Sequence, residues 1–174
     1  MKRFSFALLI LLLGRLGCAA DQPAVSEKAP AFSLPSQDGS TVSLAGNKGK
    51  WVVLYFYPKD FTSGCTVEAH NFQRDIAKFE KANAVILGVS LDSVTSHKDF
   101  CAKEGLNFKL LSDTTAAVSK TYDSVMTHEG KTYSVRNTFL VDPSGTIRKV
   151  YVKVNPATHS EDVLADLATL QSSK

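Results

Sequence analysis

The sequence lacks a basic run, an internal repeat and any pair of cysteines close enough to form a Cys-x-x-Cys motif. Its formal charge of +3 comes entirely from residues 1–20, which contain Lys2, Arg3 and Arg15 but no acidic residue. The rest of the chain is neutral overall, so it offers no electrostatic footprint for nucleic acid. The absence of a Gly-X-Y or solenoid period also excludes collagen-like and repeat architectures.

Signals for a metal or nucleotide site are equally scarce. The four histidines are far apart in the chain and show no His-x-x-His spacing. The stretch 46–50 contains two glycines but lacks the Gly-Lys-Ser/Thr ending of a phosphate-binding loop. We therefore expect neither a metal nor a cofactor. What remains is an ordinary globular composition, 44% hydrophobic and 21% charged over 174 residues, which suits one domain with one core.

The beginning of the chain has the pattern of a targeting segment. Two basic residues precede an apolar run at 4–13 that is too short to cross a bilayer, so we expect residues 1–20 to be a cleaved signal peptide. Cys18-Ala19-Ala20 suits an ordinary signal peptidase, whereas Leu16-Gly17-Cys18 resembles a lipoprotein box weakened by Arg15. These patterns predict an extracytoplasmic protein, periplasmic or secreted, with a membrane attachment only if Cys18 is lipidated. Residues 21–30, with two prolines and no apolar period, predict a mobile leader.

Alternating strands and helices are predicted for the rest of the chain. The runs 51–57 and 85–91 are continuously apolar and rich in β-branched and aromatic residues, as is typical of central strands covered on both faces. Between them, apolar residues recur at steps of four and three, which predicts an amphipathic helix carrying Cys65, Ala69, Phe72, Ile76 and Phe79. These three segments form a β-α-β unit.

The other expected elements are, in chain order, a hairpin of 32–34 and 41–44, a helix at 93–104, a short strand at 108–111, a helical stretch near 115–122, a hairpin of 138–142 and 147–154, and a helix that begins with the capping-box pattern Thr158–Glu161. This order is typical of thioredoxin-like domains. We expect an α/β, thioredoxin-like fold over residues 31–174, with a central mixed sheet flanked by helices and an N-terminal β-hairpin.

The chemistry is expected at Cys65, directly after the first core strand and in the first turn of the first core helix. Unpaired backbone N–H groups and the positive end of the helix dipole stabilise a thiolate at this position. A thioredoxin carries Cys-x-x-Cys here, whereas this chain has Thr62-Ser-Gly-Cys65. A single activated thiolate beside a hydroxyl therefore replaces the dithiol. The alternative is an inert core cysteine, because Cys65 also lies on the apolar stripe of its helix.

Flanking residues favour the reactive cysteine. The spacing Pro58-x-x-x-Thr62-x-x-Cys65 resembles the active-site signature of the peroxiredoxins, and the segments 55–60 and 64–68 are similar to the PrxQ, or bacterioferritin comigratory protein, group. The resemblance extends from about residue 28 to residue 170 and includes Val135-Arg136-Asn137-Thr138-Phe139. It implies a thiol-dependent peroxidase that reduces hydrogen peroxide and organic hydroperoxides without a cofactor.

The resemblance also implies a role for each site residue. Cys65 is the peroxidatic cysteine, Thr62 a hydroxyl that contacts the peroxide, Pro58 a shield of the pocket, and Arg136 a guanidinium beside the sulfur. No neighbouring residue in the sequence indicates a role for Arg136. Without the family resemblance it would be interpreted as a surface arginine. Glu68 is less certain, because a glutamate in a first helical turn also fits simple dipole stabilisation.

Cys101 is the expected resolving cysteine of an intramolecular disulfide with Cys65, because some PrxQ relatives place theirs in this helix. Many others have a second cysteine five residues after the first, where this chain has His70. The alternative is a buried helical cysteine in a one-cysteine enzyme. The resemblance further implies a thioredoxin-like dithiol protein as reductant, and we expect a monomer.

Two functions from other classes stay open. One is an extracytoplasmic thiol-disulfide oxidoreductase, disfavoured by the missing first cysteine of Cys-x-x-Cys. The other is a non-enzymatic domain in which a Cys65–Cys101 bridge merely stabilises the fold.

Overall fold

The computed structural model describes residues 22–173. Its centre is a five-stranded mixed sheet in the order β5-β4-β3-β8-β9, in which β3, β4 and β5 run parallel while β8 and β9 are antiparallel to their neighbours. The strands of this sheet are β3 (Trp51–Phe56), β4 (Ala84–Ser90), β5 (Lys109–Ser112), β8 (Asn137–Val141) and β9 (Ile147–Val152). Two small hairpins lie outside it, β1 (Ser33–Pro35) with β2 (Thr41–Ser43) and β6 (Val125–His128) with β7 (Lys131–Ser134).

The middle strand, β3, is buried along its whole length, as its uninterrupted apolar sequence predicts. Alternate side chains of β3 enter two separate core clusters: Trp51, Val53 and Tyr55 on one face, and Val52, Leu54 and Phe56 on the other. Both faces of the sheet must therefore be covered.

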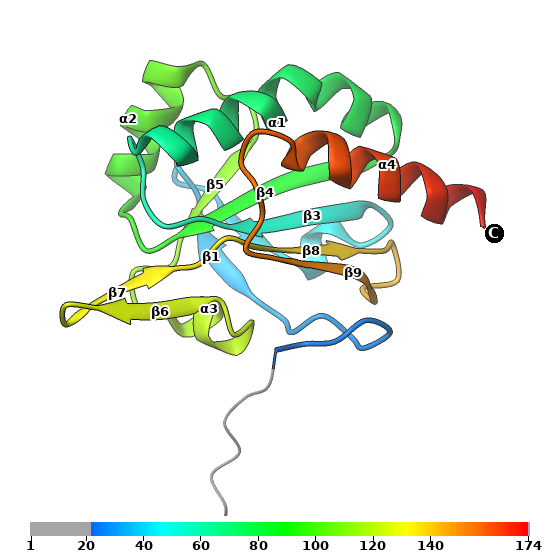
Figure 1. The fold of residues 1–174 in the computed structure, drawn as a ribbon, viewed down its shortest axis with the longest axis horizontal. Coiled ribbons are helices and arrows are strands. Elements are labelled where there is room, and N and C mark those ends of the chain that lie inside the picture. Colours follow the sequence, from blue (N-terminus) through cyan, green and yellow to red (C-terminus); the bar gives the residue numbers. More distant parts are fainter. Residues whose placement is uncertain (1–21, 174) are drawn as a thin grey trace, which may run out of the picture.

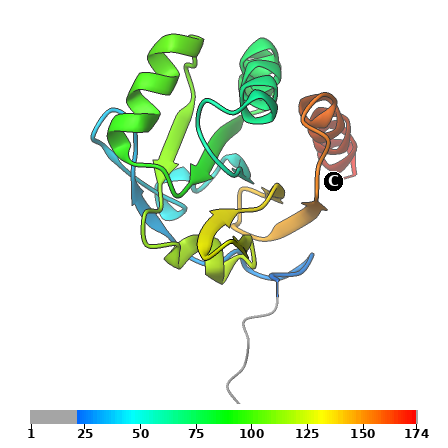
Figure 2. The same cartoon turned by 60° about the vertical axis from the view of Figure 1, so that its left-hand side comes forward.

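Helices cover one face and a mixed layer covers the other (Figure 1). The helices are α1 (Ser63–Lys81), α2 (Val94–Glu104), α3 (Ala117–Thr121) and α4 (His159–Ser172), with a 3-10 turn, η1, at Ala45–Asn47. The three long helices α1, α2 and α4 lie together over the sheet, while α3 and the β6–β7 hairpin lie on the opposite side, as the turned view in Figure 2 confirms. The predicted α/β, thioredoxin-like class with its N-terminal hairpin is confirmed.

The two helices that carry cysteines begin and end where their sequences indicate. α2 starts at the N-cap Ser93, whose hydroxyl accepts from the backbone N–H of Ser96, and stops at Gly105 in a left-handed conformation. α1 starts after Thr62, which is extended, and continues for nineteen residues. Cys65 is consequently the third helical residue of α1.

Three local features differ from expectation. The β6–β7 hairpin was missed because its strands are mostly exposed and too short to show a clear alternation. At the start of α4, the Thr158 hydroxyl donates to Asp162 instead of forming the predicted capping box. The segment 22–30, for which the sequence predicts a mobile leader, makes backbone hydrogen bonds from Ser26 and Ala29 to the β8–β9 hairpin.

Within residues 22–173, no helix combines the length and apolar character needed to cross a membrane.

Gly88 is the position where the sheet tolerates no side chain. A Cβ atom added there would lie 2.7 Å from the Tyr55 ring and 2.7 Å from Leu110. We predict that Gly88→Ala lowers the free energy of unfolding by about 1–3 kcal/mol, because overpacking must displace a buried ring. Denaturant unfolding measures this loss. Gly46→Ala is the control, since its nearest neighbour is the Ser43 hydroxyl at 3.3 Å, and a Gly88→Ala protein as stable as this control would contradict the prediction.

Candidate active site

The site lies where β3 ends and α1 begins. The loop 57–62 leads from the centre of the sheet into the helix, and the Cys65 side chain is buried at the first turn of that helix. The Thr62 carbonyl accepts the first helical hydrogen bond, from the N–H of Thr66. The preceding N–H groups at the helix start, including that of Cys65, have no partner inside the helix. The Cys65 sulfur therefore occupies a position that favours negative charge.

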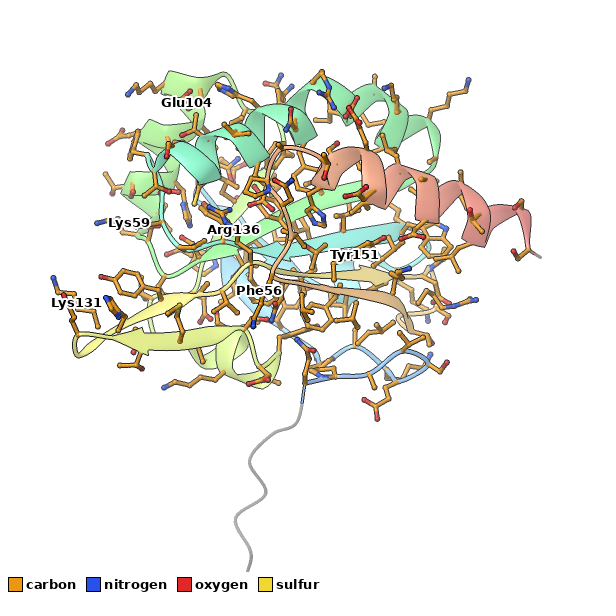
Figure 3. All side chains as sticks on the ribbon, in the orientation of Figure 1. Phe56, Lys59, Glu104, Lys131, Arg136 and Tyr151 are labelled. Atoms are coloured by element: carbon orange, nitrogen blue, oxygen red, sulfur yellow. The ribbon has the colours of Figure 1, made fainter. Side chains whose placement is uncertain are left out.

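Arg136 reaches this sulfur from the other side. It lies between β7 and β8, and its Nη2 donates to Cys65 Sγ over 3.2 Å. In Figure 3 its side chain projects from the sheet toward the beginning of α1. Gly64 makes the approach possible, because a Cβ at this residue would come within 2.9 Å of the same Nη2. The predicted meeting of Arg136 and Cys65 is thus present, although they are 71 residues apart.

The same guanidinium holds a buried carboxylate. Nη1 of Arg136 donates to Glu68 Oε2, and the side chain of Glu68 is only 1% exposed. The other oxygen, Oε1, is buried with no hydrogen-bond partner. Burial raises the pKa of Glu68 to about 7, against the lowering effect of Arg136. Glu68 therefore holds the guanidinium of Arg136 in place. The sequence alone could not distinguish this role from stabilisation of the helix dipole.

Thr62 and Pro58 both belong to the loop in front of the sulfur. The Thr62 hydroxyl is exposed and donates to the Lys59 carbonyl over 2.9 Å, which leaves its oxygen lone pairs free to accept from a ligand. Pro58 is half-buried directly after β3, and Lys59 beside it projects outward (Figure 3).

Cys101 lies in α2, and it shares the core cluster of Cys65. Both thiols are free in this structure. Cys101 is 8% exposed, and desolvation, followed by the charge of Asp60, raises its pKa to about 11. At neutral pH it is therefore an unreactive thiol while α2 remains intact.

A buried polar cluster beside the loop escaped sequence reasoning. Asp60, Tyr57 and His97 are all at most 2% exposed and hydrogen-bonded to one another. The only signal in the sequence that could have indicated this cluster was the acidic residue Asp60 directly after Pro58-Lys59, within the segment that resembles the family. Among residues 22–173, no group of His, Cys, Asp or Glu side chains is arranged to hold a metal ion.

Comparison with known proteins identifies the type of site. The model of the AhpC/TSA family matches residues 25–150, which is more than half of the chain and includes Cys65, Cys101 and Arg136. The chain belongs to the AhpC/TSA family. The predicted relationship to the PrxQ group is also confirmed, because the similar proteins are peroxiredoxins of that group.

Two curated relatives and two solved structures illustrate the similarity. Peroxiredoxin Bcp of Xanthomonas campestris is 42% identical over 145 residues, covering 80% of this chain and 91% of the relative. Peroxiredoxin Bcp of Bacillus subtilis is 40% identical over 147 residues, covering 82% and 94%. A Cys-to-Ser mutant of Xylella fastidiosa PrxQ superposes with a TM-score of 0.82 at 33% identity, covering 86% and 98%. The X. campestris bacterioferritin comigratory protein superposes with a TM-score of 0.75 at 40% identity, covering 79% and 90%.

The extracytoplasmic location predicted from the beginning of the chain is wrong. The Bcp relatives of this peroxiredoxin are bacterial cytoplasmic proteins, and the comparisons give no support for a secretion signal. A basic start followed by a short apolar run is a pattern of composition, and it was the only basis for that location. The predicted signal peptide at 1–20 and the lipidation of Cys18 lie outside the described residues.

The Glu68 carboxyl should make stability depend on pH. Its folded-state pKa, about 7, lies above the ordinary value of 4.5, so the folded state binds the extra proton between these values. Stability therefore falls as pH rises from about 4.5 to 7. We predict that Glu68→Gln removes up to about 3 kcal/mol of this fall, as two to three pKa units imply. Urea unfolding at pH 5 and pH 8 measures it, and an equal pH dependence in both proteins would contradict the assignment.

Arg136→Lys should slow the reaction of reduced enzyme with peroxide by about 100-fold, the loss typical of removing one preorganised donor. An ammonium cannot contact Glu68 and the Cys65 sulfur at once as the guanidinium fork does. Stopped-flow measurement of the first turnover provides the rate. The matched control is Arg148→Lys, because Arg148 forms only an exposed ion pair with Asp142 at 3.4 Å. Equal rates in the two variants would rule out this role for Arg136.

Proposed function

We propose that the chain reduces hydrogen peroxide and organic hydroperoxides with Cys65 as the attacking thiolate. The sulfur attacks one peroxide oxygen, the O–O bond breaks, and the other oxygen leaves with its electron pair and takes up a proton as water or an alcohol. Cys65 is thereby oxidised to a sulfenic acid.

The observation that supports this function best is the contact between Arg136 Nη2 and Cys65 Sγ at 3.2 Å. A permanently charged donor placed beside the first turn of a helix favours the thiolate before reaction. The same guanidinium is aimed at the place where negative charge moves onto the peroxide oxygens. Its attachment to the buried Glu68 keeps it there without reorganisation.

Thr62 and Pro58 complete the proposed pocket. With its own hydrogen given to the Lys59 carbonyl, the Thr62 oxygen accepts a hydrogen bond from the peroxide O–H and orients it for attack. Pro58, half-buried and without an N–H group, limits the access of water on the β3 side.

We further propose that Cys101 resolves the sulfenic acid. A Cys101 thiolate attacks the Cys65 sulfur, the S–S bond forms as the S–O bond breaks, and the sulfenic hydroxyl leaves with its electron pair and takes up one proton to become water. The raised pKa of Cys101, about 11 in the folded protein, opposes this step until α2 opens. Local unwinding around both cysteines therefore precedes the bond, which also requires the Cα atoms to come within about 7 Å.

The position that carries a second cysteine in many PrxQ proteins has a different use here. His70 Nε2 lies 2.9 Å from Glu104 Oε2, so this α1 residue contacts the last turn of α2. No thiol competes with Cys101 at this position.

The resulting disulfide needs a reductant that supplies two electrons, and we propose a thioredoxin-type dithiol protein acting on a monomeric enzyme. The X. campestris bacterioferritin comigratory protein is described as reducing alkyl peroxides, with trapped intermediate and ligand complexes. This similarity supports organic hydroperoxides as substrates here. A thiol-disulfide oxidoreductase with a Cys-x-x-Cys motif has a cysteine at the position of Thr62, and its absence argues against that function.

Cys101→Ser is the test that separates two-cysteine from one-cysteine chemistry. We predict an unchanged rate for the first peroxide equivalent, followed by arrest at the sulfenic acid and conversion to sulfinic acid in excess peroxide, because no thiol resolves it. Mass spectrometry of the products and steady-state turnover with a dithiol protein measure these outcomes. Cys65→Ser is the control and should consume no peroxide. Normal turnover of Cys101→Ser would show that Cys101 is only part of the core.

A further inference from the structure

A carboxylate in the active-site loop is bound by side chains from the loop itself and from α2. Asp60 Oδ1 accepts from the Tyr57 hydroxyl at 2.7 Å. Its Oδ2 accepts from the Ser96 hydroxyl at 2.7 Å and lies 2.9 Å from His97 Nδ1. The backbone N–H of Asp60 donates to Asp92 Oδ2 over 2.9 Å. We call the side chains of Asp60, Tyr57, Ser96 and His97 the Asp60 clasp.

Hydrogen-bond accounting shows that the clasp is fully satisfied. His97 Nε2 lies 3.2 Å from the Leu111 carbonyl, which can only accept, so this nitrogen carries a hydrogen. Nδ1 lies 2.9 Å from Asp60 Oδ2 and 3.2 Å from the Tyr57 hydroxyl, so this nitrogen also has polar partners. Because Asp60 and His97 are at most 2% exposed, water cannot reach the contact between them without opening the structure, whereas Ser96 is half-buried.

The clasp joins the two segments that must loosen before the resolving step. Asp60 belongs to the loop that leads to Cys65, whereas Ser96 and His97 belong to the first turns of α2, the helix of Cys101. The next loop residue contacts α2 as well: Phe61 packs edge-on against Phe100, with ring centroids 5.1 Å apart. Phe61 has a φ of +60°, a conformation that a bulky side chain keeps only where its surroundings hold it.

We infer that Asp60 is a positioning residue whose clasp to α2 sets how readily the reduced enzyme opens for Cys65 and Cys101 to meet. This inference rests on the proposed function. The closed clasp keeps the loop in place before Cys65 for reaction with peroxide, and release of the clasp frees α2. The clasp thereby determines how long the sulfenic acid stays beside the peroxide pocket, and hence how much of it is oxidised further.

The charge of Asp60 strengthens this coupling. Desolvation is the main cause of the raised pKa of Cys101, and the charge of Asp60 adds to it, so the residue that holds the loop also disfavours the Cys101 thiolate. When α2 opens, the contact that holds the loop is lost and the pKa of Cys101 falls toward its ordinary value.

Ser96→Ala tests the clasp with little risk to folding, because it removes only the hydroxyl that donates to Asp60. The matched control is Ser160→Ala: Ser160 donates to Asp75 Oδ2 over 2.8 Å, and Asp75, like Asp60, is a carboxylate whose side chain is 1% exposed. That second bond joins α1 to α4 and does not involve α2. Each variant therefore loses one hydrogen bond from a serine hydroxyl to a buried carboxylate, and the two bonds connect different pairs of segments.

Hydrogen exchange of the reduced proteins is the first measurement. We expect amides of residues 59–66 and 94–104 to exchange about tenfold faster in Ser96→Ala, the factor that a lost hydrogen bond to a charged group implies. Ser160→Ala should leave them unchanged. Equal exchange of these amides in Ser96→Ala and Ser160→Ala would overturn the inference, whether or not a disulfide ever forms.

Competition between resolution and overoxidation is the second measurement. We expect Ser96→Ala to form the Cys65–Cys101 disulfide faster and to yield several-fold less sulfinic acid at a given peroxide concentration, with Ser160→Ala like wild type. A sulfinic yield unaltered by Ser96→Ala while exchange is faster would show that opening does not limit resolution and would overturn the functional part of the inference. Absence of the disulfide in wild type would refute the proposed role of Cys101, and the exchange result would still decide the clasp.

Discussion

The position of one guanidinium organises the catalytic end of the molecule. Arg136 contacts the Cys65 sulfur and a carboxylate that is almost completely removed from water. A buried ion of this kind is unfavourable unless it is paired, so Glu68 and Arg136 hold each other in place. Gly64 leaves the space that this arrangement requires. The beginning of α1, the loop before β8 and the reactive thiol are consequently fixed relative to one another.

Efficient reaction with peroxide and efficient resolution impose opposite demands on this structure. In the proposed reaction the first needs Cys65 fixed at the start of an intact helix, and the proposed Cys65–Cys101 disulfide needs both cysteines to leave the core cluster that they share. The strands of the central sheet are buried between two core clusters and have no part in such a change. The adjustable parts are the loop 57–62 and α2, which are joined to each other by the hydrogen bonds of Asp60.

Patterns along the chain predicted what depends on local chemistry. Apolar runs predicted β3 and β4, Gly105 predicted the end of α2, and the spacing of Pro58, Thr62 and Cys65 predicted the family. Predictions from sequence patterns were wrong or missing where a local pattern is compatible with more than one structure or function. The apolar start of the chain resembled a secretion signal, and the polar β6–β7 hairpin showed no recognisable period. The Thr158 hydroxyl donates to Asp162 instead of forming a capping box.

The sequence by itself determined the mixed α/β fold and the placement of Cys65 at a helix start, because periodicity and turn residues act between near neighbours. Only the tertiary structure decided which charged groups surround that thiol. Arg136 reaches Cys65 across 71 residues, and His97 reaches Asp60 across 37. Glu68 shows why: its position near the start of α1 does not reveal whether it is buried, and its burial, with the resulting rise in pKa, exists only once the sheet and the loop before β8 close over it.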